Sequence, residues 1–200
     1  MKTGVLGGAF DPPHIAHLTI ARAAREQLLL DRVRFIPYAL GPHRQEGPVA
    51  SARDRMEMVR LCVAEHDAFQ ADERELLRGG VSYTVDTLEE LVGEEPGMDL
   101  VLIVGADQLE TFTTWRSWER ILELAEIAVF ARPEHTVADL PAEVVGRVRL
   151  VDLPPLQVSS TLVRRQVAEG GDIRHLVPPA VARYIEEHRL YSQYARPGNA

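Results

Sequence analysis

The stretch that decides the fold lies at the start of the chain: Thr3-Gly-Val-Leu-Gly-Gly-Ala-Phe-Asp-Pro-Pro-His-Ile-Ala-His17. Its apolar run ends in Gly7-Gly8, and a helical pattern begins at Ile15. A buried strand, a glycine turn and a helix start in this order bring backbone N–H groups and the positive end of a helix dipole to one point. The stretch therefore favours an anion-binding turn, whereas two glycines alone are more often an ordinary tight turn.

Strand patterns alternate with helix patterns along the rest of the chain. Short runs rich in Val, Ile and Leu predict strands at Thr3–Leu6, Arg32–Pro37, Asp99–Gly105, Ile127–Ala131 and Val148–Leu153. Longer periodic runs predict helices at Ile15–Leu30, Ser51–His66, Thr84–Val92, Trp115–Leu124, Ser160–Glu169 and Pro178–His188. Apolar strands of this kind suit burial on both faces. The order predicts an α/β fold, a doubly wound parallel sheet with C-terminal helices.

No internal repeat or long linker divides the chain, so residues 1–192 are expected to form a single domain and residues 193–200 a flexible tail. The 200 residues, 46% of them hydrophobic, exclude a disordered or fibrous protein. With 22 Lys plus Arg against 30 Asp plus Glu, the net charge is −8. An acidic chain does not attract nucleic acid or an anionic membrane, so neither is expected as a partner.

The single cysteine, Cys62, lies in an apolar run and excludes a disulfide within the chain. Its residue type and setting predict a buried core thiol and a reducing, cytoplasmic compartment. The first eleven residues contain no hydrophobic region long enough for a signal peptide, and no later run reaches the roughly 18 apolar residues of a membrane span.

His14 and His17 are three residues apart at the expected helix start, so both rings can face the same side. A metal pair needs further ligands, and no second Cys/His cluster supplies them. Two solvated or core histidines are the plainer alternative. Because the glycine turn and the helix end converge on the same point, donors to phosphate oxygens fit better.

A second cluster, Ser159-Ser160-Thr161-Leu-Val-Arg164, follows the last predicted strand. Alone it would be an N-cap and a surface arginine. In a doubly wound sheet, ligands gather at the carboxyl ends of the strands. Both helix starts can therefore face one polyphosphate.

These two motifs carry a resemblance. Residues Gly7–His17 resemble the G-x-F-D-P-x-H-x-x-H signature of the nucleotidylyltransferase superfamily, and residues 159–164 resemble its C-terminal S-S-T-x-x-R motif. Further matches resemble the bacterial nicotinate-nucleotide adenylyltransferase family: Pro42-His43-Arg44, Ser82-Tyr83-Thr84, Gly105-Ala106-Asp107, Trp115 and Arg132-Pro133. The resemblance implies a Rossmann-like nucleotidyltransferase fold. It also implies adenylyl transfer from ATP to nicotinate mononucleotide, giving deamido-NAD and pyrophosphate in NAD biosynthesis.

The resemblance also implies roles for single residues. Catalytic roles fall to His14, His17 and Arg164, and no protein side chain is expected to bind the metal, because the phosphates of ATP would hold Mg²⁺. The ATP site would comprise Gly7, Gly8, Ala9, Phe10, His14, His17, Gly105, Asp107, Ser159, Ser160, Thr161 and Arg164. The mononucleotide site would comprise Arg44, Tyr83, Thr84, Asp107, Trp115 and Arg132.

The chain departs from the family pattern at Gly41, where proline is common, at Arg44 in place of lysine, at Arg116 in place of an aromatic, and at Glu134 in place of glycine. Phosphopantetheine adenylyltransferase, a cytidylyltransferase and an idle adenine-nucleotide sensor are the alternative functions. The segment 38–50 can be a substrate lid or an ordinary surface loop. A homo-oligomer is compatible with the sequence, which leaves the oligomeric state and the preference for nicotinate over nicotinamide open.

Overall fold

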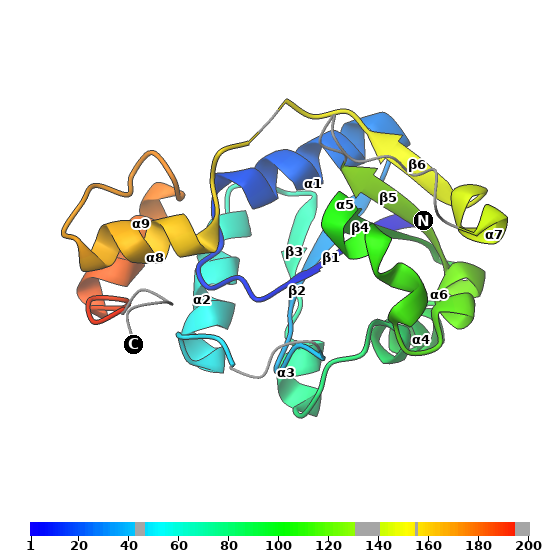
Figure 1. The fold of residues 1–200 in the computed structure, drawn as a ribbon, viewed down its shortest axis with the longest axis horizontal. Helices are drawn as coiled ribbons and strands as arrows, with labels where there is room; N and C mark the ends of the chain where they lie inside the picture. The colour runs from blue at the N-terminus through cyan, green and yellow to red at the C-terminus, as the bar shows by residue number, and fades with distance from the viewer. Residues whose placement is uncertain (43–46, 131–140, 155, 195–200) are drawn as a thin grey trace.

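A computed structural model describes residues 1–42, 47–130, 141–154 and 156–194. Its centre is a six-stranded parallel sheet in the order β3-β2-β1-β4-β5-β6 (Figure 1). The strands are β1 (Lys2–Gly8), β2 (Arg32–Pro37), β3 (Phe69–Ala71), β4 (Asp99–Gly105), β5 (Ala125–Phe130) and β6 (Val148–Val151). This architecture confirms the predicted doubly wound α/β fold.

Helices cover both faces of the sheet. The larger ones are α1 (Ile15–Leu28), α2 (Ala52–Val63), α4 (Thr84–Glu94), α6 (Trp118–Leu124), α8 (Ser160–Ala168) and α9 (Pro179–Glu187). Short helices are α3 (Arg74–Arg78), α5 (Ala106–Glu110), the 3-10 helix η1 (Phe112–Thr114) and α7 (Ala142–Val145).

The strand pattern explains this two-sided covering. Leu100, Leu102 and Val104 of β4 pack in a cluster with α4 and α6, whereas Val101 and Ile103 pack in a second cluster with α1 and α2. Alternate side chains of a strand point to opposite faces, so a strand that is apolar throughout needs a helical layer on each side.

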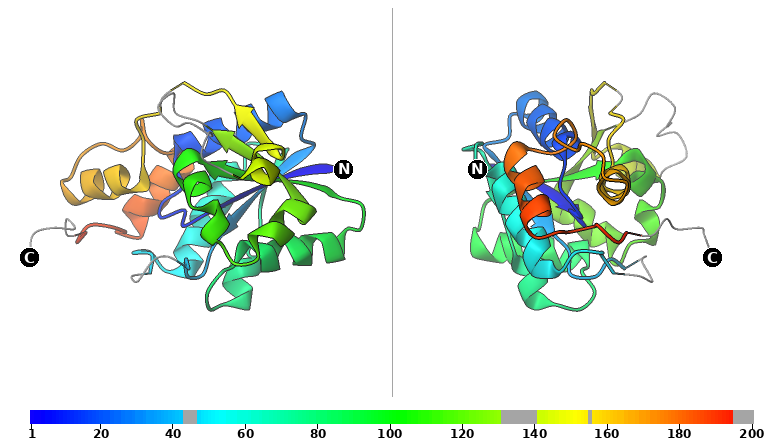
Figure 2. Two further views of the ribbon diagram at one scale, coloured as in Figure 1. Left: turned by 45° about the vertical axis from the view of Figure 1, so that its right-hand side comes forward. Right: turned by 90° about the vertical axis from the view of Figure 1, so that its left-hand side faces the viewer.

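The C-terminal helices pack against α2 and form a third cluster with it. Met58 and Cys62 of α2 contact Val163 of α8 together with Val181 and Ile185 of α9. The right-hand view of Figure 2 shows α9 lying against α2, and the left-hand view shows α8 and α9 far from α4. Cys62 is buried here, as the sequence predicts. No described helix is long and apolar enough to cross a membrane.

The central strand β1 fixes the position of the site. It pairs with β2 on one side and β4 on the other, so the order of winding reverses between β1 and β4. Ligands of such sheets bind where the strand order reverses, beyond the carboxyl ends of the strands. The Gly7-Gly8 end of β1 and the Gly105 end of β4 lie at this place.

Five short elements of the described residues were not predicted: β3, α3, α5, η1 and α7. The helix predicted at Trp115–Leu124 begins only at Trp118, and that part of the prediction was wrong. Ser117 adopts a left-handed conformation with φ 53°, which separates the helix η1 from the helix α6. Trp115 therefore lies in the connection between two helices.

Candidate functional site

A cavity of about 650 Å³ opens where the strand order reverses. Seven of the predicted site residues line it: Gly7, Gly8, Ala9, Tyr83, Thr84, Asp107 and Trp115. They come from the end of β1, from the starts of α4 and α5, and from the connection between η1 and α6, so residues distant in sequence meet here. The sheet thus brings the predicted acceptor residues next to the glycine turn.

The glycine turn leaves space on its cavity side. A Cβ atom at Gly7 would meet no atom within 4 Å, and one at Gly8 would meet the Phe10 ring at 3.4 Å. The buried Phe10, with φ 48°, packs its ring against His17 at 4.9 Å and Phe35 at 5.8 Å between centroids. Phe10 therefore supports the turn from beneath, and the backbone of Gly7 remains open to the cavity.

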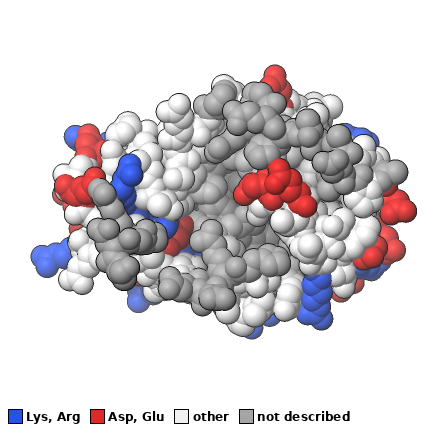
Figure 3. Space-filling view, viewed as in Figure 1, with Lys and Arg blue, Asp and Glu red and all other residues white. Residues whose placement is uncertain are grey.

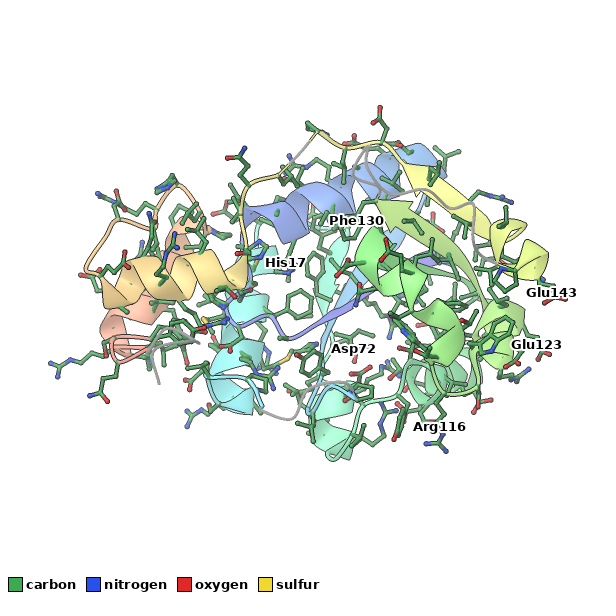
Figure 4. The ribbon with its side chains drawn as sticks, in the orientation of Figure 1. His17, Asp72, Arg116, Glu123, Phe130 and Glu143 are labelled. Atoms are coloured by element: carbon green, nitrogen blue, oxygen red, sulfur yellow. The ribbon has the colours of Figure 1, made fainter. Side chains whose placement is uncertain are left out.

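His14 and His17 lie together at the start of α1, as predicted. Their rings stack with centroids 3.8 Å apart. The backbone N–H of His14 donates to Nδ1 of His17 at 3.1 Å, so a neutral His17 carries its proton on Nε2 and can donate from that atom. Figure 4 shows His17 at the start of α1, beside the start of α8.

Both histidines are neutral in the free protein. Burial lowers the pKa of His14 to about 4. Burial, and next the neighbouring His14, lower the pKa of His17 well below its ordinary value. Nδ1 of His14 is buried and has no hydrogen-bond partner within the described chain. The pair therefore consists of uncharged hydrogen-bond donors. Burying them costs less free energy than burying charged imidazolium groups would.

The second predicted motif meets the first. Ser160 Oγ donates to the carbonyl oxygen of Pro12 at 2.8 Å, and Arg164 Nη1 donates to the carbonyl oxygen of Asp11 at 2.6 Å. Ser159 caps α8, because its side chain accepts from the N–H of Leu162 at 3.2 Å. The starts of α1 and α8 are therefore fastened to each other, and both helix dipoles favour negative charge there.

Arg164 is held on several sides, and its side chain is 11% exposed. Nη2 donates to Thr161 Oγ1 at 3.3 Å and to the Tyr194 hydroxyl at 3.1 Å. The guanidinium also lies over the Tyr194 ring, 4.6 Å from its centroid. Tyr194 belongs to the segment predicted as a flexible tail, but the structure gives it these contacts; residues 195–200 lie outside the described part.

Asp11 is a residue whose role sequence reasoning missed. Its buried carboxylate accepts from the N–H groups of Val49 at 2.6 Å and Ala50 at 3.0 Å, and from the Tyr191 hydroxyl at 2.7 Å. Burial and then the Asp11 charge raise the pKa of Tyr191, which keeps its hydroxyl protonated and donating. A charged residue between Phe10 and Pro12 in an apolar setting was the available signal.

The acceptor side of the cavity contains Trp115 and the Ser82–Thr84 segment. Trp115 packs against Phe112 at 5.5 Å and still lines the cavity, so it is both a core-contacting and a site aromatic. Arg116 places its guanidinium 4.6 Å from the centroid of the Tyr83 ring. Figure 4 shows Arg116 at the outer side of this region. Arg116 stands where the family often has an aromatic residue, and its guanidinium stacks on the aromatic ring of Tyr83.

Beside these residues, the end of β4 contributes Gly105 and Asp107. A Cβ atom at Gly105 would meet Asp107 Oδ1 at 2.5 Å, so the glycine leaves room for that carboxylate. Asp107 is exposed in the cavity wall. Arg44 and Arg132, both predicted for the mononucleotide, lie outside the described residues. The same holds for part of the predicted lid segment, residues 43–46.

Other cavity residues were not singled out from the sequence: Tyr38, Glu75 and Gln108. Gln108 Oε1 accepts from the backbone N–H of Gly105 at 3.1 Å and so fixes the turn into α5. The described residues contain no group of three or more His, Cys, Asp or Glu side chains arranged to hold a metal ion. On the face seen in Figure 3, charged side chains lie mainly around the rim, with one acidic group nearer the middle.

The fold and the site define a cytidylyltransferase-like nucleotidyltransferase, and the model of the cytidylyltransferase-like family matches residues 5–166. The relatives narrow this class. "Probable nicotinate-nucleotide adenylyltransferase" of Exiguobacterium sibiricum is 44% identical over 192 residues, covering 96% of this chain and 100% of its own. That of Symbiobacterium thermophilum is 41% identical over 197 residues, covering 95% of each chain. This chain belongs to the nicotinate-nucleotide adenylyltransferase family.

A solved structure agrees in fold. The nicotinic acid mononucleotide adenylyltransferase of Plasmodium falciparum, in complex with NaAD, superposes with a TM-score of 0.77 at 16% identity. The superposition covers 96% of this chain and 97% of that one. At this identity the likeness concerns the fold.

Proposed function

We propose that this protein transfers the adenylyl group of ATP to nicotinate mononucleotide, giving nicotinate adenine dinucleotide and pyrophosphate in NAD biosynthesis. One observation carries the proposal: Ser160 and Arg164 are bonded to Pro12 and Asp11, beside a cavity lined by Thr84 and Trp115. A polyphosphate site and an acceptor site therefore adjoin each other. The family and its relatives support this choice of substrates.

The reaction needs positioning more than acid–base chemistry. The mononucleotide phosphate is already largely ionised at neutral pH, so it attacks the α-phosphorus of ATP without a general base. The new P–O bond forms as the bond to pyrophosphate breaks, and the negative charge leaves with the pyrophosphate. The glycine turn, with Gly7 open to the cavity, lets the phosphates approach the backbone.

His17 is the donor that we assign to the phosphates. Its Nδ1 is occupied by the His14 N–H, so Nε2 is the free donor. The helix starts of α1 and α8 add backbone N–H groups and a positive dipole end. Arg164 contributes its charge from the place where Asp11, Thr161 and Tyr194 hold it. These groups stabilise the charge that develops on the leaving pyrophosphate.

We further propose that Mg²⁺ enters as its complex with ATP and stays on phosphate oxygens and water. Such a metal needs no cluster of protein ligands. The cytoplasm is the proposed compartment, on the ground of the buried, unpaired Cys62. Cell fractionation with an antibody to the protein tests the location.

The direct test measures pyrophosphate release with ATP and Mg²⁺ while nicotinate mononucleotide, nicotinamide mononucleotide and phosphopantetheine are offered separately at equal concentration. We expect the first to give the highest kcat/KM. Turnover with phosphopantetheine alone would assign a different acceptor. Measurable ATP binding without any turnover would indicate a nucleotide sensor and overturn the proposal.

A further inference from the structure

Glu75 is a buried carboxylate in the cavity wall that the reaction above does not use. It lies on α3, is 7% exposed and lines the cavity with Ser82, Tyr83 and Thr84. A carboxylate taken out of water costs free energy unless hydrogen bonds compensate it. Its partners therefore indicate what it does.

Two hydroxyl groups donate to Glu75. Thr87 Oγ1 donates to Oε1 at 2.6 Å, and the Ser82 hydroxyl donates to the same carboxylate. Each hydroxyl is itself held by an N–H donor: Ser82 Oγ accepts from the backbone of Ala39 at 3.1 Å, and Thr87 Oγ1 accepts from Arg78 Nη2 at 2.7 Å. The carboxylate is thus the final acceptor of two hydrogen-bond chains.

These chains join two walls of the cavity. The N–H of Ser82 donates to the carbonyl oxygen of Leu40 at 2.9 Å, and Leu40 forms a parallel bridge with Val81. Tyr38 and Gly41, on either side of that bridge, line the cavity together with Tyr83 and Thr84. The spacing between the 38–41 segment and the 82–84 segment is therefore set at Ser82, which Glu75 anchors.

The helix that carries Glu75 is itself fixed. Arg74 donates to Asp72 at 2.8 Å and to Glu94 at 3.0 Å, and Arg78 donates to Glu90 at 2.7 Å. A helix of five residues has little stability alone, so the ion pairs to Glu90 and Glu94 of α4 keep it in place. The position of Glu75 relative to α4 is therefore fixed.

We propose that Glu75 is a positioning residue for the mononucleotide: by accepting from Ser82 and Thr87, it holds both walls of the acceptor pocket at the spacing that the pyridine ring requires. The inference rests on the proposed function. Glu75 bonds the polar backing of the wall that carries Tyr83 and Thr84, so its loss should affect the acceptor more than it affects the two phosphate motifs at the starts of α1 and α8. Burial raises the pKa of Glu75, and the hydrogen bonds from Thr87 and Ser82 act in the opposite direction.

The test uses Glu75→Gln, which keeps the shape but leaves one acceptor oxygen for two hydroxyl donors. We expect the KM for nicotinate mononucleotide to rise on the order of tenfold, with the KM for ATP and kcat within about twofold. Glu73→Gln is the matched control, since Glu73 lies two residues away, bonds the exposed Arg60 and does not line the cavity. An unchanged acceptor KM, or equal rises in both KM values, overturns the proposal.

A second pair of variants keeps the test decisive if Glu75→Gln does not fold. Thr87→Val removes the hydroxyl at nearly constant volume, and Thr87→Ser retains it. We expect the valine variant to raise the acceptor KM and the serine variant to restore it; the same KM in both contradicts the inference. If the unmodified protein does not turn over nicotinate mononucleotide at all, the proposed function fails instead.

Discussion

Ser160 Oγ donates a hydrogen bond to the Pro12 carbonyl oxygen at 2.8 Å, across 148 residues of sequence. This bond sets the start of α8 against the turn before α1. Because neither helix start can shift without the other, the two phosphate motifs behave as one site.

Ser160→Ala should therefore weaken both ATP binding and the fold. We expect the KM for ATP to rise several-fold and the free energy of unfolding to fall by about 1 kcal/mol. Ser51→Ala is the comparison variant: it removes the α2 cap, which costs about 1 kcal/mol as well, but leaves the bond to Pro12. Equal ATP KM values for the two variants would contradict the linkage.

His17→Ala should fold and lose nearly all activity. A preorganised donor to developing charge contributes about 3 to 4 kcal/mol, so kcat should fall on the order of a hundredfold or more. Steady-state pyrophosphate release measures the loss, and circular dichroism checks the fold. His66→Ala, whose ring contacts Phe69 at 5.1 Å, should keep its activity. If the His17→Ala enzyme is active, His17 is not the phosphate donor that we assign.

Acid should destabilise the protein through His14 and His17, because both have lowered pKa values in the folded state. The pKa of His14 is about 4 in the folded state against 6.5 for the ordinary group, so the unfolded chain binds the proton first. The contribution of these neutral histidines to the free energy of unfolding is fully present above pH 6.5 and is lost as the pH falls toward 4. His14 alone accounts for about 3 kcal/mol of this loss, and His17 acts in the same direction.

Urea unfolding between pH 7 and pH 4 measures this loss. A His14→Gln variant, which cannot titrate, should lose less stability over the same range. If both proteins show the same slope of stability against pH, the buried neutral histidine is not the source.

Gly7→Ala should weaken ATP binding without destabilising the fold. A Cβ atom at Gly7 meets no protein atom within 4 Å, so the variant should be as stable as the parent or about 0.5 to 1 kcal/mol more stable. The methyl group would occupy space at the cavity, so the Kd for ATP should rise.

Gly4→Ala is the matched control in the same strand. There a Cβ atom would meet Leu30 Cδ1 at 2.8 Å inside the core, so stability should fall while the cavity is unchanged. Thermal unfolding and ATP titration of both variants give the two readouts. An ATP Kd for Gly7→Ala equal to that of the parent would show that the turn does not need its open backbone.

The sequence predicted what depends on local pattern. Strands such as Asp99–Gly105 and helix starts such as Ile15 follow from runs of apolar residues and from capping, and the structure has the same bounds. The three residues of β3 and the five of α3 are too short for a period to appear. At Ser117 a left-handed backbone delays the helix to Trp118, although the predicted helical pattern begins at Trp115.

The same distinction applies to the site. His14, His17 and the Ser159–Arg164 segment were predictable because their spacing along one helix start determines which way they face. Glu75 and Asp11 were not, because their partners come from other elements: Asp11 bonds Tyr191, and Glu75 bonds Thr87. Only the packed structure shows such pairs.

The hydrogen bond between Tyr191 and Asp11 also has a consequence for protein synthesis. Asp11 leaves the ribosome among the first residues, and its partner is made 180 residues later. A nascent chain in which all six strands have emerged still lacks the hydroxyl that completes the Asp11 carboxylate. The hydrogen bonds of Asp11 are therefore completed only by the turn that follows α9, and a product of premature termination can have a complete sheet without a working enzyme.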